Sequence, residues 1–361
     1  MNHDRPDGPR GIATAPGRVN LMGDHTDYND GLVLPAAIPL SCRVRFTPSA
    51  DEQIRVRTDA DPGGEVTIRA GDAPDGGRGW AALVASVAAS LDARGRPARG
   101  MAAHVSSDVP LGAGLSSSAS FEVALALALC GAAGWSLERA ELAAACREAE
   151  EAATGVPCGP MDQLASLFGK RGHALMLDCR SLETDAVAVP AGLRVVAIHT
   201  GVARTLAGSA YASRRDACAR LARDLGVASL RDATPPRVRD SPIGRHVVSE
   251  NARVLATADA LRLDDRDALG TLFAESHRSL AEDYGVSTPE LDALVAAATA
   301  AGAVACRMTG AGFGGCVVAL LDRATADAVL ARATERYRTA TGHEPIVYRC
   351  DPSDGARIDP A

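Results

Sequence analysis

A glycine-serine turn directly before an apolar segment is the first feature of the chain whose residue types suit chemistry. It reads VPLGAGLSSSAS at residues 109–120 and continues as FEVALALALC, which predicts a helix. Glycines let backbone N–H groups approach an anion, a helix N-terminus adds unpaired donors, and serine hydroxyls can bind phosphate or Mg²⁺. The pattern favours a triphosphate site, and a capped glycine turn without a ligand is the alternative. The residues concerned are Gly112, Ala113, Gly114, Leu115, Ser116, Ser117 and Ser118.

Residues 15–29 (APGRVNLMGDHTDYN) concentrate polar side chains between two apolar runs. Arg18 is followed by Asp24, His25 and Asp27. Carboxylates accept hydrogen bonds from neighbouring hydroxyls, and histidine donates or accepts them, so this set suits a polyhydroxylated ligand. A solvated turn capped by its own Asp and Asn side chains is the alternative at this point.

A single acid, Asp162, stands between Gly159-Pro160 and an apolar stretch. By itself it is better explained as the N-cap of a helix. Phosphoryl transfer, however, needs a carboxylate to take or orient the hydroxyl proton, a cation for the developing charge, and Mg²⁺ across the phosphates. Asp162, Arg18 and the region of Ser118 supply these parts if folding brings them together.

A second glycine cluster, GAGFGG at residues 310–315, fits the GxGxxG pattern of a dinucleotide-binding loop. It leads into CVVALL, which predicts a strand, whereas a dinucleotide loop must open a helix. An NAD-dependent oxidoreductase therefore fails on structural context, and we expect a close-approach loop in another domain. The Walker A pattern GxxxxGK[ST] occurs nowhere in the chain.

The composition narrows the classes of partner and the compartment. The 361 residues carry a formal net charge of -7 with Lys and Arg scattered, which disfavours nucleic acid and membrane surfaces as partners. No apolar window approaches the roughly 18 to 20 residues that span a bilayer, so we expect a cytoplasmic protein. The nine cysteines stand singly without metal-ligand spacing, and we expect buried, reduced thiols.

The elements around these motifs mix helices and strands without strict alternation, which predicts the α+β class. The length predicts two domains, with a boundary near residue 190. Gly and Asp predict a loop at residues 61–79. Predicted helices follow the glycine-serine turn and lie at residues 80–94, 136–153 (opened by Ser136), 209–225, 246–261, 266–281 and 288–301. Predicted strands include residues 18–22, 31–40, 101–109, 315–321 and 345–349.

Together, the motifs resemble those of the GHMP kinases, and within them the galactokinase family. GRVNLMGDHTDYNDG at residues 17–31 resembles the galactokinase signature, VPLGAGLSSSAS the phosphate loop, and MTGAGFGGC at residues 308–316 the third motif. Other segments are similar to galactokinase segments in the right order, among them CGPMDQLASLFGKRGHALMLDCRSLET, SAYASRRDAC and ESHRSLAEDYGVSTPELDALV. The resemblance runs from residue 12 to residue 356.

The resemblance implies a two-domain GHMP kinase fold with the active site in the cleft between the domains. Residues 1–190 would form an N-terminal domain like ribosomal protein S5 domain 2, with the sugar motif and the phosphate loop. Residues 191–361 would form a ferredoxin-like C-terminal GHMP domain. The implied activity is ATP- and Mg²⁺-dependent phosphorylation of the anomeric hydroxyl of galactose or a close analogue, and we expect a monomer.

The resemblance also assigns roles to individual residues. Asp162 would be the catalytic base, and Arg18 beside it would stabilise the transferring phosphoryl group. Residues Gly112 to Ser118 would wrap the phosphates, Ser118 and Glu150 would bind Mg²⁺, and Trp80 would border the adenine. From the residues alone, Glu150 is equally well a solvated acid on a helix. The sugar would be held by Asp24, His25, Thr26, Asp27 and the distant Tyr211.

Two positions depart from the galactokinase pattern. Asp24 stands where Glu, one methylene longer, is usual and reaches the exocyclic hydroxyl of the sugar, and Pro160 replaces an aliphatic residue. One alternative is therefore a GHMP kinase for a related substrate, such as arabinose, an amino sugar or a deoxy sugar. A non-catalytic sensor of galactose and ATP is another, but such sensors resemble the family with part of the SSSAS run missing, and here it is complete.

Overall fold

A computed structural model describes residues 10–72, 79–202 and 207–360, which fold into three β-sheets covered by helices. The strands are β1 (Gly11–Asn20), β2 (Leu32–Val33), β3 (Pro35–Ser49), β4 (Gln53–Thr58), β5 (Asp61–Arg69), β6 (Gly100–Ser107), β7 (His173–Asp178), β8 (Thr184–Ala188), β9 (Leu193–His199), β10 (Ala305–Met308), β11 (Cys316–Asp322), β12 (Ile346–Arg349) and β13 (Arg357–Pro360). This mixture confirms the α+β class.

The helices lie between the strands and carry most of the residues that cover the sheets. They are α1 (Trp80–Asp92), α2 (Ser117–Ala133), α3 (Arg139–Thr154), α4 (Met161–Phe168), α5 (Ala207–Asp224), α6 (Pro242–Leu263), α7 (Arg266–Arg278), α8 (Pro289–Ala301) and α9 (Ala326–Thr341). Shorter helical turns occupy Asp27–Asn29, Leu230–Asp232, Pro235–Val238 and Ser279–Asp283.

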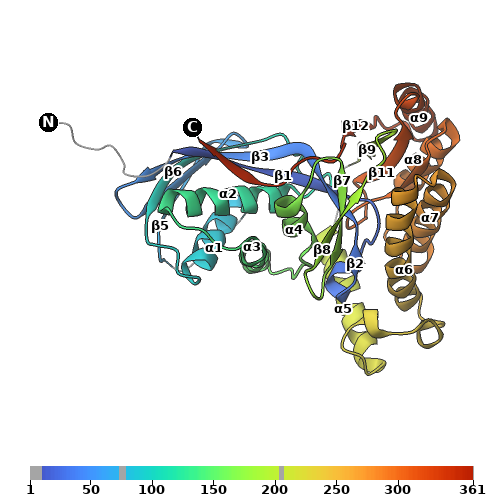
Figure 1. Cartoon of the computed structure of the whole chain (residues 1–361), viewed down its shortest axis with the longest axis horizontal. Coiled ribbons are helices and arrows are strands. Elements are labelled where there is room, and N and C mark those ends of the chain that lie inside the picture. Colours follow the sequence, from blue (N-terminus) through green and yellow to red (C-terminus); the bar gives the residue numbers. More distant parts are fainter. Residues whose placement is uncertain (1–9, 73–78, 203–206, 361) are drawn as a thin grey trace.

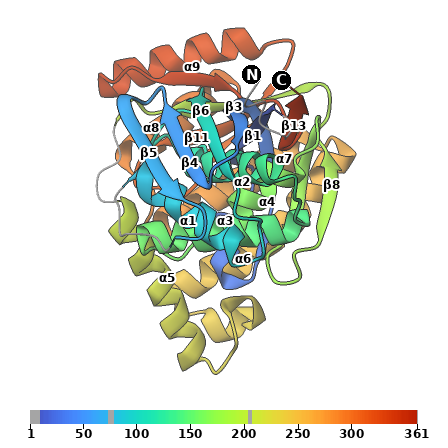
Figure 2. The same cartoon turned by 90° about the vertical axis from the view of Figure 1, so that its left-hand side faces the viewer.

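The N-terminal half is built on a six-stranded sheet with the order β13-β1-β3-β6-β4-β5. Figure 2 shows these strands side by side, with α1, α2 and α3 on one face. Along the second half of β3, Val44 and Phe46 are buried, whereas Arg43 and Arg45 are exposed. This period of two is what a sheet with one covered face requires. The covered face holds α2, which is buried over most of its length because its sequence is apolar nearly all round.

The last strand of the chain returns to the N-terminal sheet. β13 pairs antiparallel with β1, from Gly11 opposite Pro360 to Thr14 opposite Arg357, and Figure 1 shows this red end of the chain beside blue β1. The domain limits at residues 1–190 and 191–361 stay a prediction. A cut at residue 190 would, however, remove one strand from the first sheet.

The C-terminal half holds an antiparallel sheet with the order β10-β11-β9-β12. β11 therefore lies between β9 and β10, which is the strand order of a ferredoxin-like sheet. Val195 and Ala197 on β9 pack in a core with α6 and α7, while Val196 and Ile198 pack in a second core with α8 and α9. Helices on both faces explain why β9 is apolar without alternation.

The two halves share one hydrophobic core. Val19 of β1 and Leu21, which directly follows that strand, belong to the same cluster of buried residues as Val195 of β9 and Phe273 of α7. A continuous core holds side chains from both halves in fixed relative positions. The small third sheet, with the order β2-β7-β8, lies beside this junction (Figure 1).

The structure bears on the expectation that the cysteines are buried thiols. All nine cysteines are free, and eight of them are buried, as predicted. Over the described ranges, no helix combines the length and the apolar character that crossing a membrane requires.

Candidate active site

The structure brings Asp162, Arg18 and the glycine-serine loop together. Arg18 of β1 and Asp162, in the first turn of α4, are 144 residues apart in sequence, yet they form a two-pronged ion pair. Nε of Arg18 lies 2.8 Å from Oδ1 of Asp162, and Nη2 lies 2.9 Å from Oδ2. Nη1 of Arg18 donates to the carbonyl of Gly114 at 2.6 Å, and the hydroxyl of Ser116 donates to Oδ2 of Asp162 at 2.5 Å.

A glycine in β1 makes this convergence possible. The pairing of β1 with β3 shifts register between Pro16 and Arg18, which turns the strand at Gly17. A Cβ at Gly17 would lie 2.5 Å from the carbonyl oxygen of Leu115. Since that carbonyl accepts the backbone N–H of Arg18 at 3.1 Å, any larger residue would separate β1 from the loop.

The loop itself alternates between two kinds of residue. Gly112, Gly114 and Ser116 have positive φ angles of 71°, 82° and 60°, whereas Ala113 and Leu115 between them are buried. The buried side chains hold the loop on the core, so its backbone faces outward at the start of α2. Such a turn before a helix N-terminus concentrates backbone donors and suits an anion. The assignment of these residues to phosphate stays a prediction.

Two side chains beside the loop, one hydroxyl and one carboxylate, offer oxygen atoms that could bind a metal ion. The hydroxyl of Ser118 donates to Oε1 of Glu150 at 2.8 Å, and both residues line the same cavity. The other carboxylate oxygen of Glu150 accepts from Nε2 of Gln163 at 2.8 Å and from the thiol of Cys158 at 3.3 Å. The part of the chain that the structure describes holds no cluster of three His, Cys, Asp or Glu residues suited to a metal. One carboxylate and one hydroxyl fit Mg²⁺, which commonly takes few protein ligands and completes its shell with phosphates and water.

Behind this pair lies a buried acid that the sequence analysis did not single out. Glu122 of α2 is fully buried, and its Oε2 accepts from Nε2 of Gln163 at 3.1 Å. The same Gln163 nitrogen also holds Glu150, so the amide links the two carboxyl groups. Burial, followed by the charge of Glu150, raises the pKa of Glu122 well above its ordinary value. One acid within the otherwise apolar run FEVALALALC is the signal that could have revealed it.

Replacing Glu122 by Gln should change how stability depends on pH. Because the folded pKa of Glu122 is raised, stability is lost as pH rises above the ordinary value of 4.5 toward the folded pKa. The Glu122→Gln variant has no titrating group at this position. We therefore expect the Tm of the variant, relative to that of the wild type, to rise by roughly 2 to 4 °C between pH 5 and pH 8. Calorimetry at several pH values measures the difference, and Glu183→Gln, at an exposed acid, serves as the control. A difference in Tm that stays constant with pH would contradict the assignment.

The sugar motif is anchored by a chain of hydroxyl groups. Nε2 of His25 lies 3.2 Å from the carbonyl of Ala311, which only accepts, so this nitrogen carries the proton. Nδ1 then accepts from the hydroxyl of Tyr28 at 2.7 Å, and Tyr28 accepts from Tyr284 at 2.8 Å. The thiol of Cys218 follows at 3.1 Å from Tyr284. Burial lowers the pKa of His25 to about 3, so the ring is neutral and both its nitrogens are already engaged.

Asp24 is held by the protein rather than left open to a ligand. Its Oδ1 accepts from Asn20 at 3.1 Å and from the backbone N–H of Gly310 at 3.0 Å. Its Oδ2 is paired with Arg307 of β10, which is fully buried. Asp24 borders the cavity, but at most a small part of its hydrogen-bonding capacity is left for a substrate. Arg307 and Glu250, 3.8 Å apart, were both missed by the sequence analysis.

Asp27 is the acid of the motif that faces the cavity, together with Tyr211 of α5. The carboxylate of Asp27 packs against Gly159, where an added Cβ would lie 2.1 Å from Oδ2. Glycine at this position therefore makes room for the acid. The rings of Tyr28 and Tyr211 lie 5.4 Å apart edge to face, and His25 lies 5.9 Å from Tyr211. Burial, and then the like charge of Asp162, raise the pKa of Asp27 to about 7.

The raised pKa of Asp27 predicts a pH dependence of sugar use. A carboxylate accepts hydrogen bonds from two hydroxyls, whereas the protonated acid loses part of that capacity. We therefore expect kcat/KM for the sugar to rise with pH through about 7 in the wild type. Asp27→Asn should lower kcat/KM by about 10-fold or more and abolish this rise, as measured from pH 5.5 to 8.5.

The control for this prediction is Asp30 of the same turn, a partly exposed acid paired with Arg180 at 3.5 Å, replaced as Asp30→Asn. It should keep the wild-type pH profile because it does not line the cavity. A rise near pH 7 that persists in Asp27→Asn would assign the titration to another group.

Besides Ala113 and Leu115, which are buried under the loop, two predicted residues do not line the cavity in the described part of the chain. The hydroxyl of Thr26 lies 2.7 Å from the carbonyl oxygens of both Gly23 and Leu32, to either of which it can donate its one proton, and it thus fixes the turn. Trp80 lies at the start of α1, with its ring nitrogen 3.4 Å from Asp61. The lining of the cavity, as far as the chain is described, includes neither side chain. Their assigned roles toward sugar and adenine stay predictions without a contact to support them.

The remaining features meet in one cavity of ≈ 410 Å³ between the two halves. It is within the range of small-molecule sites. Gly310 and Ala311 of the second glycine cluster are also among the lining residues. That cluster therefore forms part of the cavity wall instead of a dinucleotide-binding loop. The lining residues predicted from the sequence are Arg18, Asp24, His25, Asp27, Gly112, Gly114, Ser116, Ser117, Ser118, Glu150, Asp162 and Tyr211.

Family models match three parts of the chain. Residues 82–170 match the GHMP kinases N-terminal domain, and residues 257–339 match the GHMP kinases C-terminal domain. Residues 2–48 match the galactokinase galactose-binding signature.

Solved structures of kinases resemble the whole chain. A crystal structure of Lactococcus lactis galactokinase complexed with galactose is 29% identical, with a TM-score of 0.91 over 96% of this chain and 95% of that chain. Mevalonate kinase from Methanococcus jannaschii is 16% identical, with a TM-score of 0.68 over 97% of this chain and 100% of that chain. A D-glycero-D-manno-heptose 1-phosphate kinase from Bacteroides thetaiotaomicron is 18% identical, with a TM-score of 0.64 over 97% and 99%. These last two similarities concern the fold.

The matched N-terminal and C-terminal domains and the similarity of the whole chain to a solved galactokinase define a GHMP kinase, and the predicted two-domain GHMP kinase fold is confirmed. The signature at the N-terminal end and the extent of the similarity to the Lactococcus lactis enzyme narrow this class further. The chain belongs to the galactokinase family and is an ATP-dependent sugar kinase.

Proposed function

We propose that this kinase transfers the γ-phosphate of ATP to the anomeric hydroxyl of galactose, with Asp162 as the base and Arg18 beside it. The observation that carries the proposal is the arrangement of Asp162, Arg18 and Ser116 at the mouth of the glycine loop, in one cavity with Asp27 and Tyr211. An acid, a fixed cation and backbone donors are the parts that phosphoryl transfer needs. The galactose signature and the galactokinase similarity support the choice of sugar.

Asp162 is oriented for proton transfer by two partners. Arg18 occupies one edge of the carboxylate through two hydrogen bonds, and Ser116 donates to Oδ2. A carboxylate fixed in this way suits a loose transition state in which the proton leaves the hydroxyl late. Arg18 is only 7% exposed, so its charge acts in a poorly solvated place where it stabilises the negative oxygens of the phosphoryl group.

ATP would lie with its phosphates along the loop from Gly112 to Ser118. Backbone N–H groups of the loop and the first turn of α2 would bind the phosphate oxygens. Ser118 and Glu150 would hold Mg²⁺, which neutralises charge on the β- and γ-phosphates when bound. Gln163 positions Glu150 by donating to it, and Glu122 in turn positions Gln163.

The sugar would occupy the end of the cavity lined by Asp27 and Tyr211. Asp27 would accept hydrogen bonds from two neighbouring hydroxyls, and the neutral His25 would shape the wall rather than bind directly. Because Arg307 retains Asp24, the exocyclic end of the sugar would have few charged partners. This last observation favours a second candidate, a kinase for a related pentose, amino or deoxy sugar. A cytoplasmic location and a monomeric state stay predictions from the sequence.

An ADP-release assay with Mg-ATP across a sugar panel tests the proposal. The panel comprises galactose, its 2-amino and 6-deoxy forms, arabinose and glucose, and NMR of the product identifies the phosphorylated hydroxyl. We expect the highest kcat/KM with galactose and phosphate on the anomeric oxygen. A higher value with another panel member would replace galactose by the second candidate. Binding of galactose and ATP without ADP release from any sugar would favour the sensor.

A further inference from the structure

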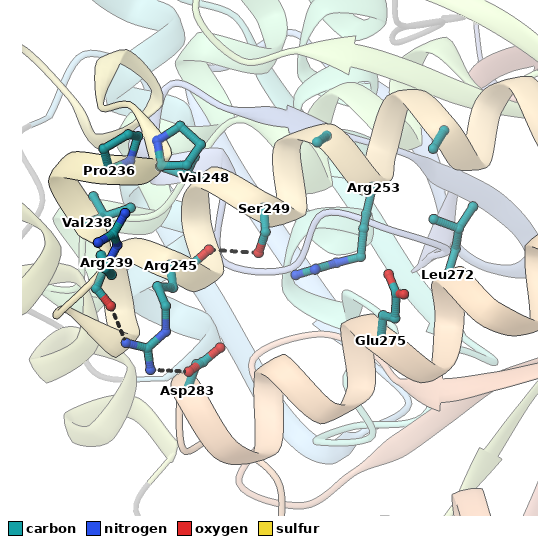
Figure 3. Close-up of a pocket in the computed structure, with 13 residues that line it drawn as sticks. Pro236, Val238, Arg239, Arg245, Val248, Ser249, Arg253, Leu272, Glu275 and Asp283 are labelled. Carbon is teal, nitrogen blue, oxygen red and sulfur yellow. Dashed lines mark hydrogen bonds and ion pairs between the residues drawn. The ribbon is translucent and has the colours of Figure 1, made fainter.

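A second cavity, larger than the first, lies in the helical layer of the C-terminal half. Its volume is ≈ 740 Å³, and α6, α7 and the turns at Pro235–Val238 and Ser279–Asp283 surround it. Figure 3 shows Val238 and Val248 toward one end and Leu272 toward the other. The volume is typical of small-molecule sites, and the apolar lining suits the body of an organic ligand. The galactokinase signature, the phosphate loop and the third motif contribute none of its lining residues, whereas Glu275 and Asp283 belong to the galactokinase-like segment that begins at residue 275.

The charged groups of this cavity leave a positive excess. Its lining includes three arginines and two acids, which gives a formal charge of +1 in a chain of net charge -7. Arg245 is paired with Asp283 at 2.6 Å. Arg239 is exposed at the rim, and its guanidinium forms no ion pair within 4 Å among the described residues. An anion therefore has an available partner at the rim.

Arg253 connects the cavity to a buried acid. Its Nε donates to Oε2 of Glu250 at 2.7 Å, and Figure 3 shows its side chain extending from α6 between Ser249 and Glu275. Its Nη2 is buried and has no hydrogen-bond partner in the described part of the chain. A buried donor without a partner costs roughly 1 to 3 kcal/mol, which a ligand oxygen would relieve.

Glu250 in turn holds the sugar motif. It is fully buried, and its Oε1 accepts the backbone N–H of Gly23 at 3.1 Å and the hydroxyl of Ser276 at 2.7 Å. Gly23 directly precedes Asp24, and an added Cβ there would lie 2.6 Å from the carbonyl of Leu32. The turn therefore has little freedom to adjust. A change at Arg253 reaches the sugar motif through two hydrogen bonds.

We propose that this cavity is an effector site for an amphipathic organic anion, and that its occupancy alters sugar affinity through Arg253, Glu250 and Gly23. The apolar body lies on Val238, Val248 and Leu272, and a single sulfonate, carboxylate or phosphate lies at Arg239 and Arg253. A polyanion does not fit, because Glu275 and Asp283 also line the cavity and would repel it. The binding step does not depend on the sugar kinase activity, whereas the coupling step rests on the proposed sugar site.

Two probes that share one apolar body test the site on the full chain. They are 1-anilinonaphthalene-8-sulfonate and its neutral analogue N-phenyl-1-naphthylamine, followed by fluorescence and calorimetry. We expect the sulfonate to bind with one-to-one stoichiometry and at least about 5-fold more tightly than the neutral probe, because charge-assisted hydrogen bonds are the stronger ones. Arg239→Gln should reduce this preference. Equal affinities of the two probes would overturn the anion specificity.

A cavity-filling variant locates the binding. Ala252→Trp places a large side chain in the cavity and should abolish probe binding, while Leu255→Trp, at an exposed position of the same helix outside the lining, should not. Both substitutions lie at exposed positions, so folding and ADP release should stay at the wild-type level. Unchanged probe binding in Ala252→Trp would overturn the location.

The coupling is measured by calorimetric titration of galactose with and without saturating sulfonate probe. We expect the Kd for galactose to change by about 5-fold or more in the wild type and to stay constant in Ala252→Trp. An unchanged Kd in the wild type would overturn the coupling, while the binding site is judged by the probe titrations alone. Absence of galactose binding in every variant would count against the proposed substrate, and the titration would then use the best sugar of the panel.

Discussion

Asp162→Asn should lower kcat by about 100-fold or more while the protein stays folded and retains ATP. Asn has the size of Asp but cannot take the proton of the sugar hydroxyl. It also cannot accept two charge-assisted hydrogen bonds from Arg18, so the guanidinium loses its fixed place beside the phosphoryl group. The effect should fall on kcat rather than on KM, because the interactions with Asp162 develop in the transition state. Single-turnover measurement of the chemical step, with ATP binding by calorimetry, gives both quantities.

The matched control is Asp232→Asn. Asp232 forms the same kind of two-pronged pair, with Arg180 at 2.9 Å and 2.8 Å, on the surface and outside the cavity. Its kcat should stay within about twofold of wild type, since exposed ion pairs contribute little. If Asp162→Asn turned over at a rate similar to that of Asp232→Asn, Asp162 would not be the base.

The local pattern of the sequence is enough to place most of the helices and the glycine loop. The expected helices at residues 209–225 and 288–301 correspond to α5 and α8, and the apolar run after the loop is α2. The loop at Gly112 and Gly114 adopts the positive φ angles that glycine permits without steric cost. These features depend on residues that are close together in the sequence, which is why the sequence alone predicts them. The sequence could therefore predict a phosphate-binding loop at the start of a helix. That Arg18 and Asp162 meet beside this loop is known only from the structure.

Other features depend on distant partners and were predicted wrongly or not at all. Residues 61–69 form strand β5 instead of a loop, because pairing with β4 overrides their Gly and Asp content. α3 begins at Arg139 after Glu138, not at Ser136. The pairing of β13 with β1 joins the two ends of the chain, and no local signal reports such a contact.

The sequence also could not predict which residues of the sugar motif are free to bind a ligand. Asp24, His25 and Asp27 are all polar and titratable, yet the structure leaves mainly Asp27 free to contact a ligand. His25 is neutral with both nitrogens engaged, and Asp24 is paired with Arg307, which lies 283 residues away. Polarity and spacing show that a segment carries functional groups. The partners that occupy those groups come from the opposite half of the molecule, and so they appear only with the tertiary structure.

Arg307→Met should destabilise the protein by about 3 to 5 kcal/mol, because it leaves a buried carboxylate without its cation. Asp24 is 1% exposed and Arg307 is fully buried, so water cannot replace the lost partner. Glu250 keeps Arg253, and the deficit therefore belongs mainly to Asp24. Urea unfolding at pH 7 gives the free energy of unfolding. Because methionine is similar in length to arginine, the substitution leaves little empty space.

Asp24→Asn in the Arg307→Met background separates charge from packing. The neutral amide can still accept the backbone N–H of Gly310, so the double variant should regain about half of the lost free energy or more. The deficit of the single variant should also shrink as pH falls, since burial raises the pKa of Asp24 and protonation removes the unpaired charge. A deficit that is the same at pH 5 and pH 8, and unchanged in the double variant, would mean that Arg307 acts through packing alone.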